Sequence, residues 1–478
     1  MSEWHGMATL YEALQSYKKQ GITPMHMPGH KRWADFAADL PWHLDITEIE
    51  GFDNLHAPTG LLRDAQDRAA RLWGSDAAFF LVNGSTSGLL AGIYAAVQPG
   101  EKVLVARNCH KAVYHAIELL GLLPVYLEPP ILAETGVCGS ISPELVTAAV
   151  EEHPDIRLVV IVSPTYEGIL SDVGTITQIL HARGIPLLVD EAHGAHLGLS
   201  EHFPAGAVSV GADIVVQSLH KTLPSLTQTA LLHLNGVLVS RERMQHALAV
   251  FQSSSPSYVL LASIDACVAE LAVRGKALLA DWRGRLDRFY QTAGLNKLSL
   301  LAEGQDAAHI FAHDPSKIVI LCEGTDRSGT ELMDVLRRDF DIELEMALDA
   351  YAIAMTGLGS TDEDFDRLRE ALREIDDRCA VQRRTREARP YPRIPEAVMM
   401  AGEALRMPGR QVALAESVGC IAKTYLWAYP PGIPLLAPGV PITQEIAASL
   451  VALAEEGVEL KSTFHRISPD FVEVVDKG

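Results

Sequence analysis

The chain has 478 residues, nearly half of them hydrophobic and about a fifth charged, a composition that excludes a disordered protein. The 61 acidic residues outnumber the 40 basic ones and give a net charge of −21, so the surface repels nucleic acid and anionic membranes and attracts small cations. The length is sufficient for two or three domains, each with its own core.

The six cysteines are scattered and form no Cys-x-x-Cys pair, which argues against a disulfide framework and against a structural zinc site. The N-terminus lacks a basic region followed by an apolar core, and no apolar run reaches the ~18 residues that a membrane-spanning helix needs. We therefore expect a cytoplasmic protein with no nucleic-acid partner, no membrane partner and no metal.

An amphipathic helix is predicted over residues 8 to 20, and the prolines and glycine of Pro24 to Lys31 then break helical structure. Two histidines and a lysine in that stretch indicate either the lining of a site or a structural turn, and the sequence leaves both open. Residues 1–50 are expected to form an N-terminal arm. A helix over Leu61 to Trp73 follows a second irregular stretch.

The segment Phe79 to Leu89 reads as an apolar strand, a turn of small and hydroxylated residues, and the start of an apolar helix. Ser85 and Thr86 lie where a helix start offers free N–H groups, an arrangement that binds phosphate. The segment matches neither a nucleotide P-loop nor a dinucleotide fingerprint, so the phosphate of a small cofactor is the better fit. Ser85 acting as a simple helix cap would explain the same residues.

Strand and helix patterns then alternate, which predicts an α/β fold with a mostly parallel central sheet and helices on both faces. In such a sheet, ligands bind beyond the carboxyl ends of the strands. The strands are expected near Lys102 to Ala106, Pro124 to Glu128, Arg157 to Val162, Pro186 to Asp190, Asp213 to Ser218 and Thr229 to Leu234.

Two of these strands end in reactive side chains. One ends at Asp190, and the other runs into Ser218, His220 and Lys221. An acid and an amine at one edge of a sheet suit pyridoxal phosphate, whose aldehyde forms a Schiff base with lysine and whose ring nitrogen needs an acidic partner. Each element alone is common in α/β proteins, and the prediction depends on their combination with the phosphate turn.

Three histidines near these strand ends are further candidates. His110 could stack on the cofactor ring, and His193 could contact the ring hydroxyl or the substrate carboxylate. His193 and His196 could instead suggest a metal pair, but no third ligand lies nearby in the sequence.

The second half of the chain divides by composition. Residues 241 to 292 are mostly helical in pattern, a break follows at Gly294, and the next segment reads as a β-α-β-β-α unit. A charged linker then leads to a portion with a proline-rich loop, Tyr429 to Gly439, and a C-terminal helix. We expect an arm over 1–50, a large cofactor-binding domain over 51–295, a small α+β domain over 296–380 and a C-terminal domain over 381–478.

Several of these motifs, taken in order, resemble those of the pyridoxal-phosphate-dependent ornithine/lysine/arginine decarboxylases of fold type I. The resemblance covers nearly the whole chain. The matching segments are Met25 to Lys31, Val82 to Gly88, Arg107 to Lys111, Ser163 to Gly168, Leu188 to Gly194, Ser218 to Lys221 and Tyr429 to Pro434.

The resemblance implies a role for each candidate residue. Lys221 would form the Schiff base, Asp190 would bind the ring nitrogen and His110 would stack on the ring. The phosphate would be held by Ser85, Thr86, Ser218 and His220. A homodimer or higher homo-oligomer, with sites completed by the partner subunit, is also implied.

The expected function is decarboxylation of a basic amino acid to the amine and CO2, with arginine first, then lysine or ornithine, feeding polyamine synthesis as in short bacterial members of the family. The alternatives are another fold type I enzyme, such as an aminotransferase or aldolase, and a non-catalytic homologue that binds the cofactor. One departure concerns substrate choice: the family usually has Pro-Gly-Glu where this chain has Pro438, Gly439 and Val440.

Overall fold

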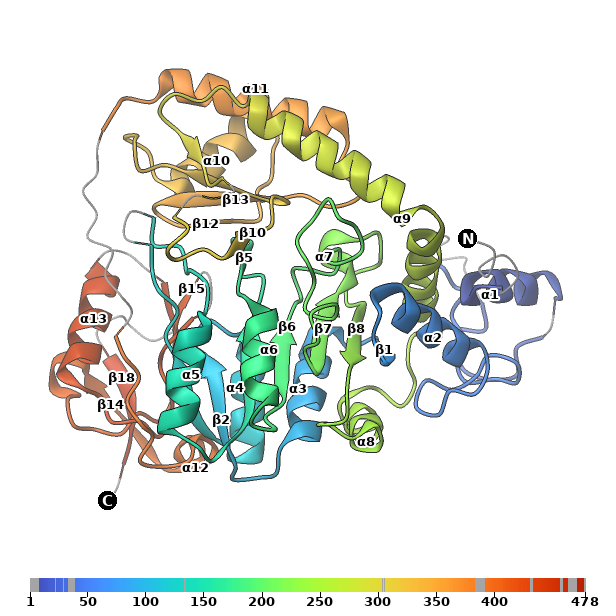
Figure 1. The fold of residues 1–478 in the computed structure, drawn as a ribbon, viewed down its shortest axis with the longest axis horizontal. Coiled ribbons are helices and arrows are strands. Elements are labelled where there is room, and N and C mark those ends of the chain that lie inside the picture. Colours follow the sequence, from blue (N-terminus) through green and yellow to red (C-terminus); the bar gives the residue numbers. More distant parts are fainter. Residues whose placement is uncertain are drawn as a thin grey trace. The chain divides into compact units, whose positions relative to one another are not determined.

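The structure is a computed structural model, and Figure 1 shows its ribbon. It describes residues 8–476 except for 22, 29, 33–38, 133–134, 303, 305, 383–391, 430–432, 456–458 and 463–470. The chain forms two compact units. The first unit consists of Met1–Ala96, Leu188–Arg285 and Gly357–Ser360, and the second of Val97–Leu187, Leu286–Thr356 and Thr361–Gly478. The four-part domain division stays a prediction.

The strands of the first unit are almost completely buried, as expected for apolar runs covered on both faces. β6 and β7 are parallel, whereas β8 runs antiparallel to both β7 and β1. The order across the sheet is β1 (Ala77–Leu81), β8 (Ala230–Leu234), β7 (Ile214–Ser218), β6 (Leu187–Asp190).

Helix α3 (Gly84–Ala96) packs against this sheet through two glycines. A Cβ atom at Gly88 would lie 2.6 Å from Leu81 Cδ1 and 2.9 Å from Val216 Cγ1. One at Gly92 would lie 2.8 Å from Leu188 Cδ1. The small residues therefore let the helix axis approach the strands closely.

A buried ion pair joins three of the remaining helices of the first unit. Asp265 accepts hydrogen bonds from Arg68 Nη2 at 2.9 Å and from the Leu10 backbone N–H at 2.7 Å, and all three residues are buried. The carboxylate thus connects three helices that are far apart in sequence. These three are α1 (Leu10–Lys19), α2 (Leu61–Trp73) and α9 (Tyr258–Thr292), which continues into the second unit. The first unit also contains α7 (Leu219–Thr222) and α8 (Arg241–Phe251).

In the second unit, β2 pairs in parallel with β3 and with β4, in the order β4-β2-β3. Helices alternate with these strands along the chain, as the sequence predicted. The elements are β2 (Lys102–Ala106), α4 (Lys111–Leu120), β3 (Leu123–Leu127), α5 (Pro143–Glu152), β4 (Ile156–Val162), β5 (Ile169–Leu170) and α6 (Val173–His181).

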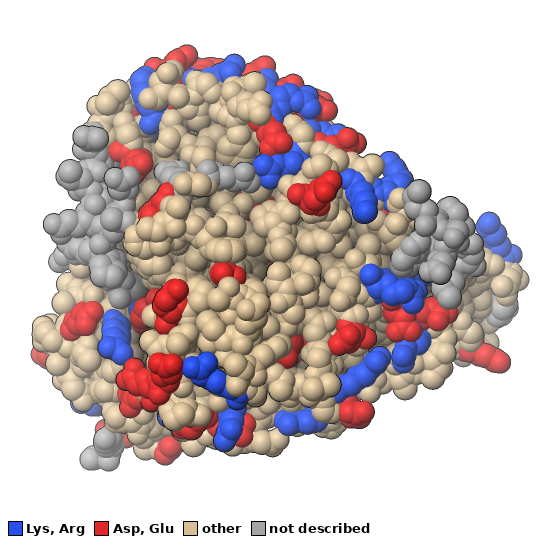
Figure 2. All heavy atoms as spheres, viewed as in Figure 1, with Lys and Arg blue, Asp and Glu red and all other residues tan. Residues whose placement is uncertain are grey.

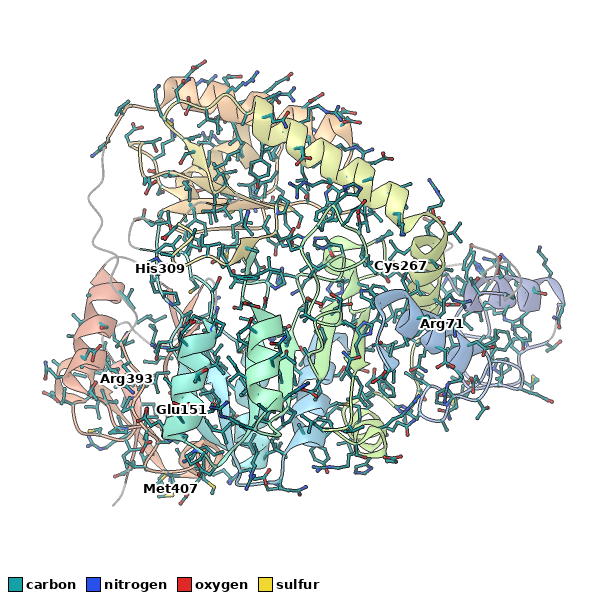
Figure 3. The ribbon with its side chains drawn as sticks, viewed as in Figure 1. Arg71, Glu151, Cys267, His309, Arg393 and Met407 are labelled. Atoms are coloured by element: carbon teal, nitrogen blue, oxygen red, sulfur yellow. The ribbon has the colours of Figure 1, made fainter. Side chains whose placement is uncertain are left out.

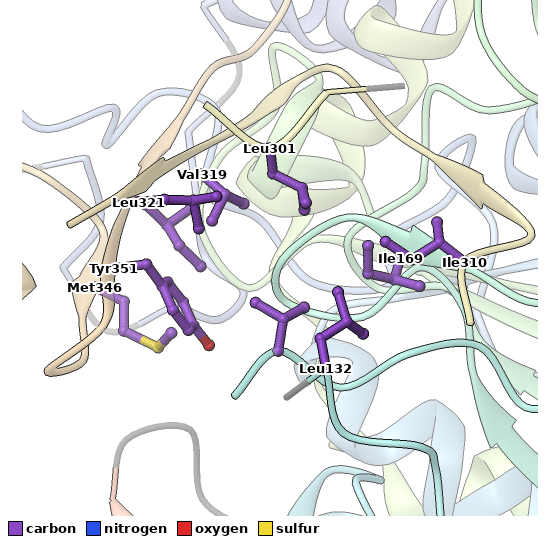
Figure 4. Packing of buried hydrophobic residues seen from close by; sticks show 10 residues of the cluster. Leu132, Ile169, Leu301, Ile310, Val319, Leu321, Met346 and Tyr351 are labelled. Atoms are coloured by element: carbon purple, nitrogen blue, oxygen red, sulfur yellow. The ribbon is translucent and has the colours of Figure 1, made fainter. Parts of the chain in front are cut away.

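The predicted β-α-β-β-α unit is present in the second unit, with strand order β12-β13-β11-β9. Figure 4 shows its packed side chains, in which Val319, Leu321 and Tyr351 from the sheet meet Leu132 and Ile169. The elements are β9 (Ser299–Leu300), β10 (Ala312–His313), β11 (Lys317–Leu321), α10 (Gly329–Phe340), β12 (Met346–Ala347), β13 (Tyr351–Met355) and α11 (Asp362–Arg378).

The C-terminal segment contains more strands than the sequence predicted. The proline-rich loop includes a strand, β16, which is at the edge of its sheet, where Pro434 interrupts no central ladder. Residues 430–432 of that loop lie outside the described part. The elements are α12 (Ala401–Arg406), β14 (Gly409–Ala413), η1 (Leu414–Glu416), β15 (Leu426–Tyr429), β16 (Ile433–Leu436), α13 (Gln444–Glu455), β17 (Glu459–Ser462) and β18 (Phe471–Val475).

Arg107, directly after β2, fixes this C-terminal segment. Its guanidinium is almost fully buried and donates to the Pro434 carbonyl at 3.0 and 3.1 Å and to the Pro392 carbonyl at 2.6 Å. Glu128 accepts a further hydrogen bond at 3.0 Å and supplies the counter-charge. A single cation therefore satisfies backbone groups from two distant segments.

The mixed α/β class with a mostly parallel sheet, predicted from the alternation, is confirmed. Figure 2 shows acidic and basic side chains interspersed on one face, without a single large basic patch. Among the described helices, none is both long enough and apolar enough to cross a bilayer.

The contact at Gly88 predicts a loss of stability on substitution. Gly88→Ala should lower the free energy of unfolding by about 1–3 kcal/mol, because the added methyl overlaps Leu81 and Val216. Gly284→Ala on α9 is the control: nothing lies within 4 Å of its Cβ position, so helix propensity should raise stability by up to about 1 kcal/mol. Urea unfolding measures both, and equal effects would contradict the packing argument.

Candidate active site

Lys221 lies on the short helix α7, directly after the buried strand β7. The Leu219 amide donates to the Thr229 carbonyl at 3.1 Å, which ties the start of α7 to the segment before β8. The side chain of Lys221 is half-buried, and its Nζ lies 2.8 Å from His193 Nε2. An ammonium donates and cannot accept, so His193 is the neutral acceptor when Lys221 is charged.

Asp190 ends β6, the strand parallel to β7, and pairs in register with Val216. The two strands therefore bring Asp190 and the residues after Ser218 to the same edge of the sheet. Asp190 is only 3% exposed, and its Oδ1 accepts from the Ala192 amide at 3.1 Å. Burial raises the pKa of Asp190, while the charge of Lys221 and the Ala192 hydrogen bond oppose that rise.

The start of α3 lies at this same edge. Leu81 at the end of β1 and Ser218 at the end of β7 both pair in register with Ala230 of β8. Gly84, with φ of +70°, begins the helix, and Ser85 Oγ lies 2.5 Å from Ser218 Oγ. Two hydroxyls and the first amides of α3 thus meet, with Thr86 exposed beside them.

His220 is oriented by the backbone. Its Nδ1 lies 3.0 Å from the Thr229 carbonyl, which can only accept, so Nδ1 carries the proton. Nε2 is then the ring atom that can contact a ligand. The side chain is half-buried on the short helix that also carries Lys221.

The two histidines of the segment after β6 have different surroundings. His193 contacts Lys221, as described. The ring of His196 is fully buried, with centroid distances of 4.8 Å to both Phe203 and Trp282. His196 therefore packs in the core of the first unit, which does not support a metal pair formed by these two rings.

His110 lies in the second unit, where it forms the N-cap of α4. Its Nδ1 accepts from the Ala112 amide at 3.2 Å, and the residue is exposed in this chain. Its predicted role in stacking on a cofactor ring stays a prediction.

Four polar side chains in the first unit that the sequence analysis assigned no role form a hydrogen-bonded chain. Glu191 Oε2 accepts from Gln217 Nε2 at 2.7 Å, and Gln217 Oε1 lies 3.2 Å from His233 Nε2. His233 Nδ1 lies 2.9 Å from Ser75 Oγ. All but the half-buried Ser75 are buried. The signal in the sequence was Glu191, the acid that directly follows Asp190. Its hydrogen-bond partners could not be found there, because they depend on strand pairing.

The six thiols do not take part in these contacts. All are free cysteines, and five of them are buried. Cys267, labelled on α9 in Figure 3, has its pKa raised to about 12 by burial. A thiol with that pKa is a poor nucleophile near neutral pH.

Comparison with protein families gives one strong match. A family model described as "Orn/Lys/Arg decarboxylase, major domain" matches residues 8–300, which is more than half of the chain.

Relatives of known name are similar over almost the full length. The arginine decarboxylase of Bacillus subtilis is 33% identical over 476 residues, covering 96% of each chain. That of Halalkalibacterium halodurans is 33% identical over 455 residues, covering 91% of each. Among solved structures, the lysine decarboxylase of Francisella novicida superimposes with a TM-score of 0.85 at 20% identity, covering 99% of this chain and 82% of that one. At that identity the structural likeness concerns the fold.

Proposed function

Because the chain belongs to the Orn/Lys/Arg decarboxylase family, we propose that it removes the α-carboxyl group of arginine as CO2 and releases the corresponding amine. The family makes it a pyridoxal-phosphate-dependent decarboxylase of basic amino acids with the fold type I architecture. Aminotransferase and aldolase activities are correspondingly less favoured. Arginine is proposed first because the relatives at 33% identity are named arginine decarboxylases.

The observation that carries the proposal is the meeting of three groups at one sheet edge. Lys221 contacts His193 at 2.8 Å, Asp190 is buried on the parallel strand, and the Ser85 and Ser218 hydroxyls lie 2.5 Å apart at the start of α3. An amine, an acid and a set of phosphate donors are the three groups that hold the cofactor.

The donors and acceptors present fit the cofactor. Asp190 uses Oδ1 for the Ala192 amide, and its Oδ2 accepts no hydrogen bond from the residues that the structure describes, so it can pair with a protonated ring nitrogen. The hydroxyls and the helix start offer only neutral donors and a partial positive charge to a phosphate. Bound there, pyridoxal phosphate would supply an electron sink for the charge left when CO2 departs.

We assign the residues of this chain as follows. Lys221 would hold the cofactor covalently, and Asp190 would keep the ring nitrogen protonated. His193 would exchange a proton with Lys221 Nζ across the 2.8 Å contact. The phosphate would be bound by Ser85, Thr86, Ser218 and His220, and His110 would stack on the ring.

Substrate choice depends on groups other than Val440. Val440 is 1% exposed, its amide donates to Ala437 and its carbonyl accepts from Ala422. A buried apolar side chain supplies no charge for a cationic substrate. We propose that the preference for arginine over lysine and ornithine is set elsewhere in the chain.

The wider setting is proposed from the family resemblance. The enzyme would act as a homodimer in the cytoplasm and supply an amine for polyamine synthesis. The net charge of −21 supports a cationic substrate, because it attracts small cations.

Direct product analysis tests the reaction. Purified protein with added cofactor should release CO2 from arginine faster than from lysine or ornithine, with one amine formed per CO2. The measurement is CO2 trapping with carboxyl-labelled substrates and chromatography of the products. Formation of a keto acid with transfer of the amino group would instead support an aminotransferase.

The covalent role of Lys221 gives a second prediction. Lys221→Ala should reduce kcat by roughly 10³-fold or more, because a covalent catalytic group is removed. Borohydride reduction followed by peptide mass spectrometry should locate the cofactor on residue 221 in the wild type and leave the variant unlabelled. Lys276→Ala, an exposed position on α9, is the matched control. Near-normal turnover by Lys221→Ala would refute the assignment.

The paired hydroxyls predict a phosphate-specific loss of affinity. Ser85→Ala should weaken binding of pyridoxal phosphate by about tenfold to a hundredfold, because a hydrogen bond to a charged group contributes about 1.5–3 kcal/mol. Binding of pyridoxal, which lacks the phosphate, should be unchanged. Ser254→Ala, an exposed serine, serves as control in the same fluorescence titration. An equal loss for both ligands would argue for a general structural defect.

A further inference from the structure

Glu191 and Asp190 are neighbours in sequence but lie on opposite faces of the sheet. Asp190 pairs with Val216, which packs against Gly88 of α3, so Asp190 faces α3. Glu191 contacts the side chain of Gln217, the residue after Val216, which points to the other face because side chains alternate along a strand. A ligand at the α3 face would therefore be held by Asp190 and not by Glu191.

The hydrogen-bonded chain from Glu191 to Ser75 has one consistent set of donors and acceptors when Glu191 is ionised. Oε1 accepts from the Ala207 amide at 2.7 Å and Oε2 from the Gln217 amide group. Gln217 Oε1 then accepts from His233 Nε2–H, and His233 Nδ1 accepts from the Ser75 hydroxyl. In this arrangement every polar side-chain atom of these four hydrogen-bonded residues has a partner.

A second arrangement satisfies the same contacts when Glu191 holds a proton. Oε2–H donates to Gln217 after its amide turns over, Gln217 N–H donates to His233 Nε2, and His233 Nδ1–H donates to Ser75 Oγ. One proton is taken from solvent, and His233 stays neutral while its ring proton changes from Nε2 to Nδ1. The geometry thus allows two states of opposite polarity.

We propose that Glu191 is a positioning residue for Asp190. The hydrogen-bonded chain from Glu191 through Gln217 and His233 to Ser75 changes polarity as Glu191 gains or loses a proton. The protonation of Glu191 thereby sets whether the sheet edge carries one negative charge or two. The inference rests on the proposed function, because Asp190 is the residue that would pair with the ring nitrogen. Glu191 acts on it through space and through the backbone that they share.

Few groups face Glu191. They are the Ala207 amide from the segment before β7, Gln217 of β7 and, behind it, His233 of β8. Asp190 is the charge that acts on it among the described residues. Among the described residues, no cation acts on Glu191 to offset a second negative charge on this face, and ionisation of both acids is disfavoured.

The titration directions agree with this arrangement. The pKa of Glu191 is raised to about 8: burial is the main cause and the charge of Asp190 adds to it, while the hydrogen bonds from Ala207 and Gln217 oppose the rise. Burial lowers the pKa of His233 to about 3, so the imidazole stays neutral and only its tautomer changes. Near neutral pH the proton therefore resides on Glu191. The charge of Lys221 favours the ionised form of Asp190, against the effect of its burial.

The first experiment measures stability against pH for the full-length protein with cofactor bound. A carboxyl whose pKa is higher in the folded state than its usual value near 4.5 stabilises the fold at low pH, and that contribution is lost as pH rises to about 8. Glu191→Gln cannot ionise. Its Tm relative to wild type should therefore increase from pH 5 to pH 8 and stay constant above that range.

The control is Glu201→Gln, which removes the same charge from an exposed position of the first unit. Its Tm difference from wild type should not change over this pH range. A Tm difference for Glu191→Gln that is also independent of pH would overturn the proposal, because a purely structural role shifts stability equally at every pH.

A measurement on the unmodified protein covers the case in which Glu191→Gln does not fold. With ¹⁵N-labelled histidine, one neutral imidazole should change from the Nδ1–H to the Nε2–H tautomer as pH rises through about 8. The absence of any such change would overturn the proposal. If the Tm difference and the tautomer change are both observed but no basic amino acid yields CO2, the proposed function fails while the polarity change stands. If CO2 is released but neither change is observed, only the inference about Glu191 is refuted.

Discussion

The hydrogen-bonded ladder of β6, β7 and β8 determines where the functional side chains of the first unit lie. Asp190 pairs with Val216 and Ser218 with Ala230, so an acid and, three residues after Ser218, an amine leave the sheet at one edge. Alternation along β6 then decides which of two adjacent carboxyls faces α3. A shift of one residue in this register would turn Asp190 to the opposite face and place Val189 or Glu191 against α3 instead.

Burial acts on the two carboxyls in the same direction but with different consequences. Asp190 lies near Lys221, whose charge favours its ionised form, and has an oxygen available for a ligand. Glu191 has a neutral amide as its side-chain partner, and its negative neighbour favours the protonated form. Two acids with the same side-chain chemistry can thus differ in charge at neutral pH because their partners differ.

The sequence predicted the elements well where local pattern determines them. Apolar runs followed by reactive residues located the strands that end at Asp190 and Ser218, and the hydroxylated turn located the start of α3. It could not predict that β8 runs antiparallel, or that Glu191, Gln217 and His233 meet, because strand order and register are non-local. The prolines concealed β16, since a proline is compatible with an edge strand and the sequence does not say which strands are edges.

Arg107 limits how the C-terminal segment can be exchanged between related proteins. Its buried guanidinium donates hydrogen bonds to Glu128 and to the carbonyls of Pro392 and Pro434. The two prolines lie 285 and 327 residues from Arg107 in sequence. A chain truncated before residue 392, or recombined with a tail that does not present those carbonyls, would leave a buried cation without most of its acceptors. Gene fusion or domain shuffling would therefore have to transfer the tail together with β2, so the two are expected to be inherited as one piece.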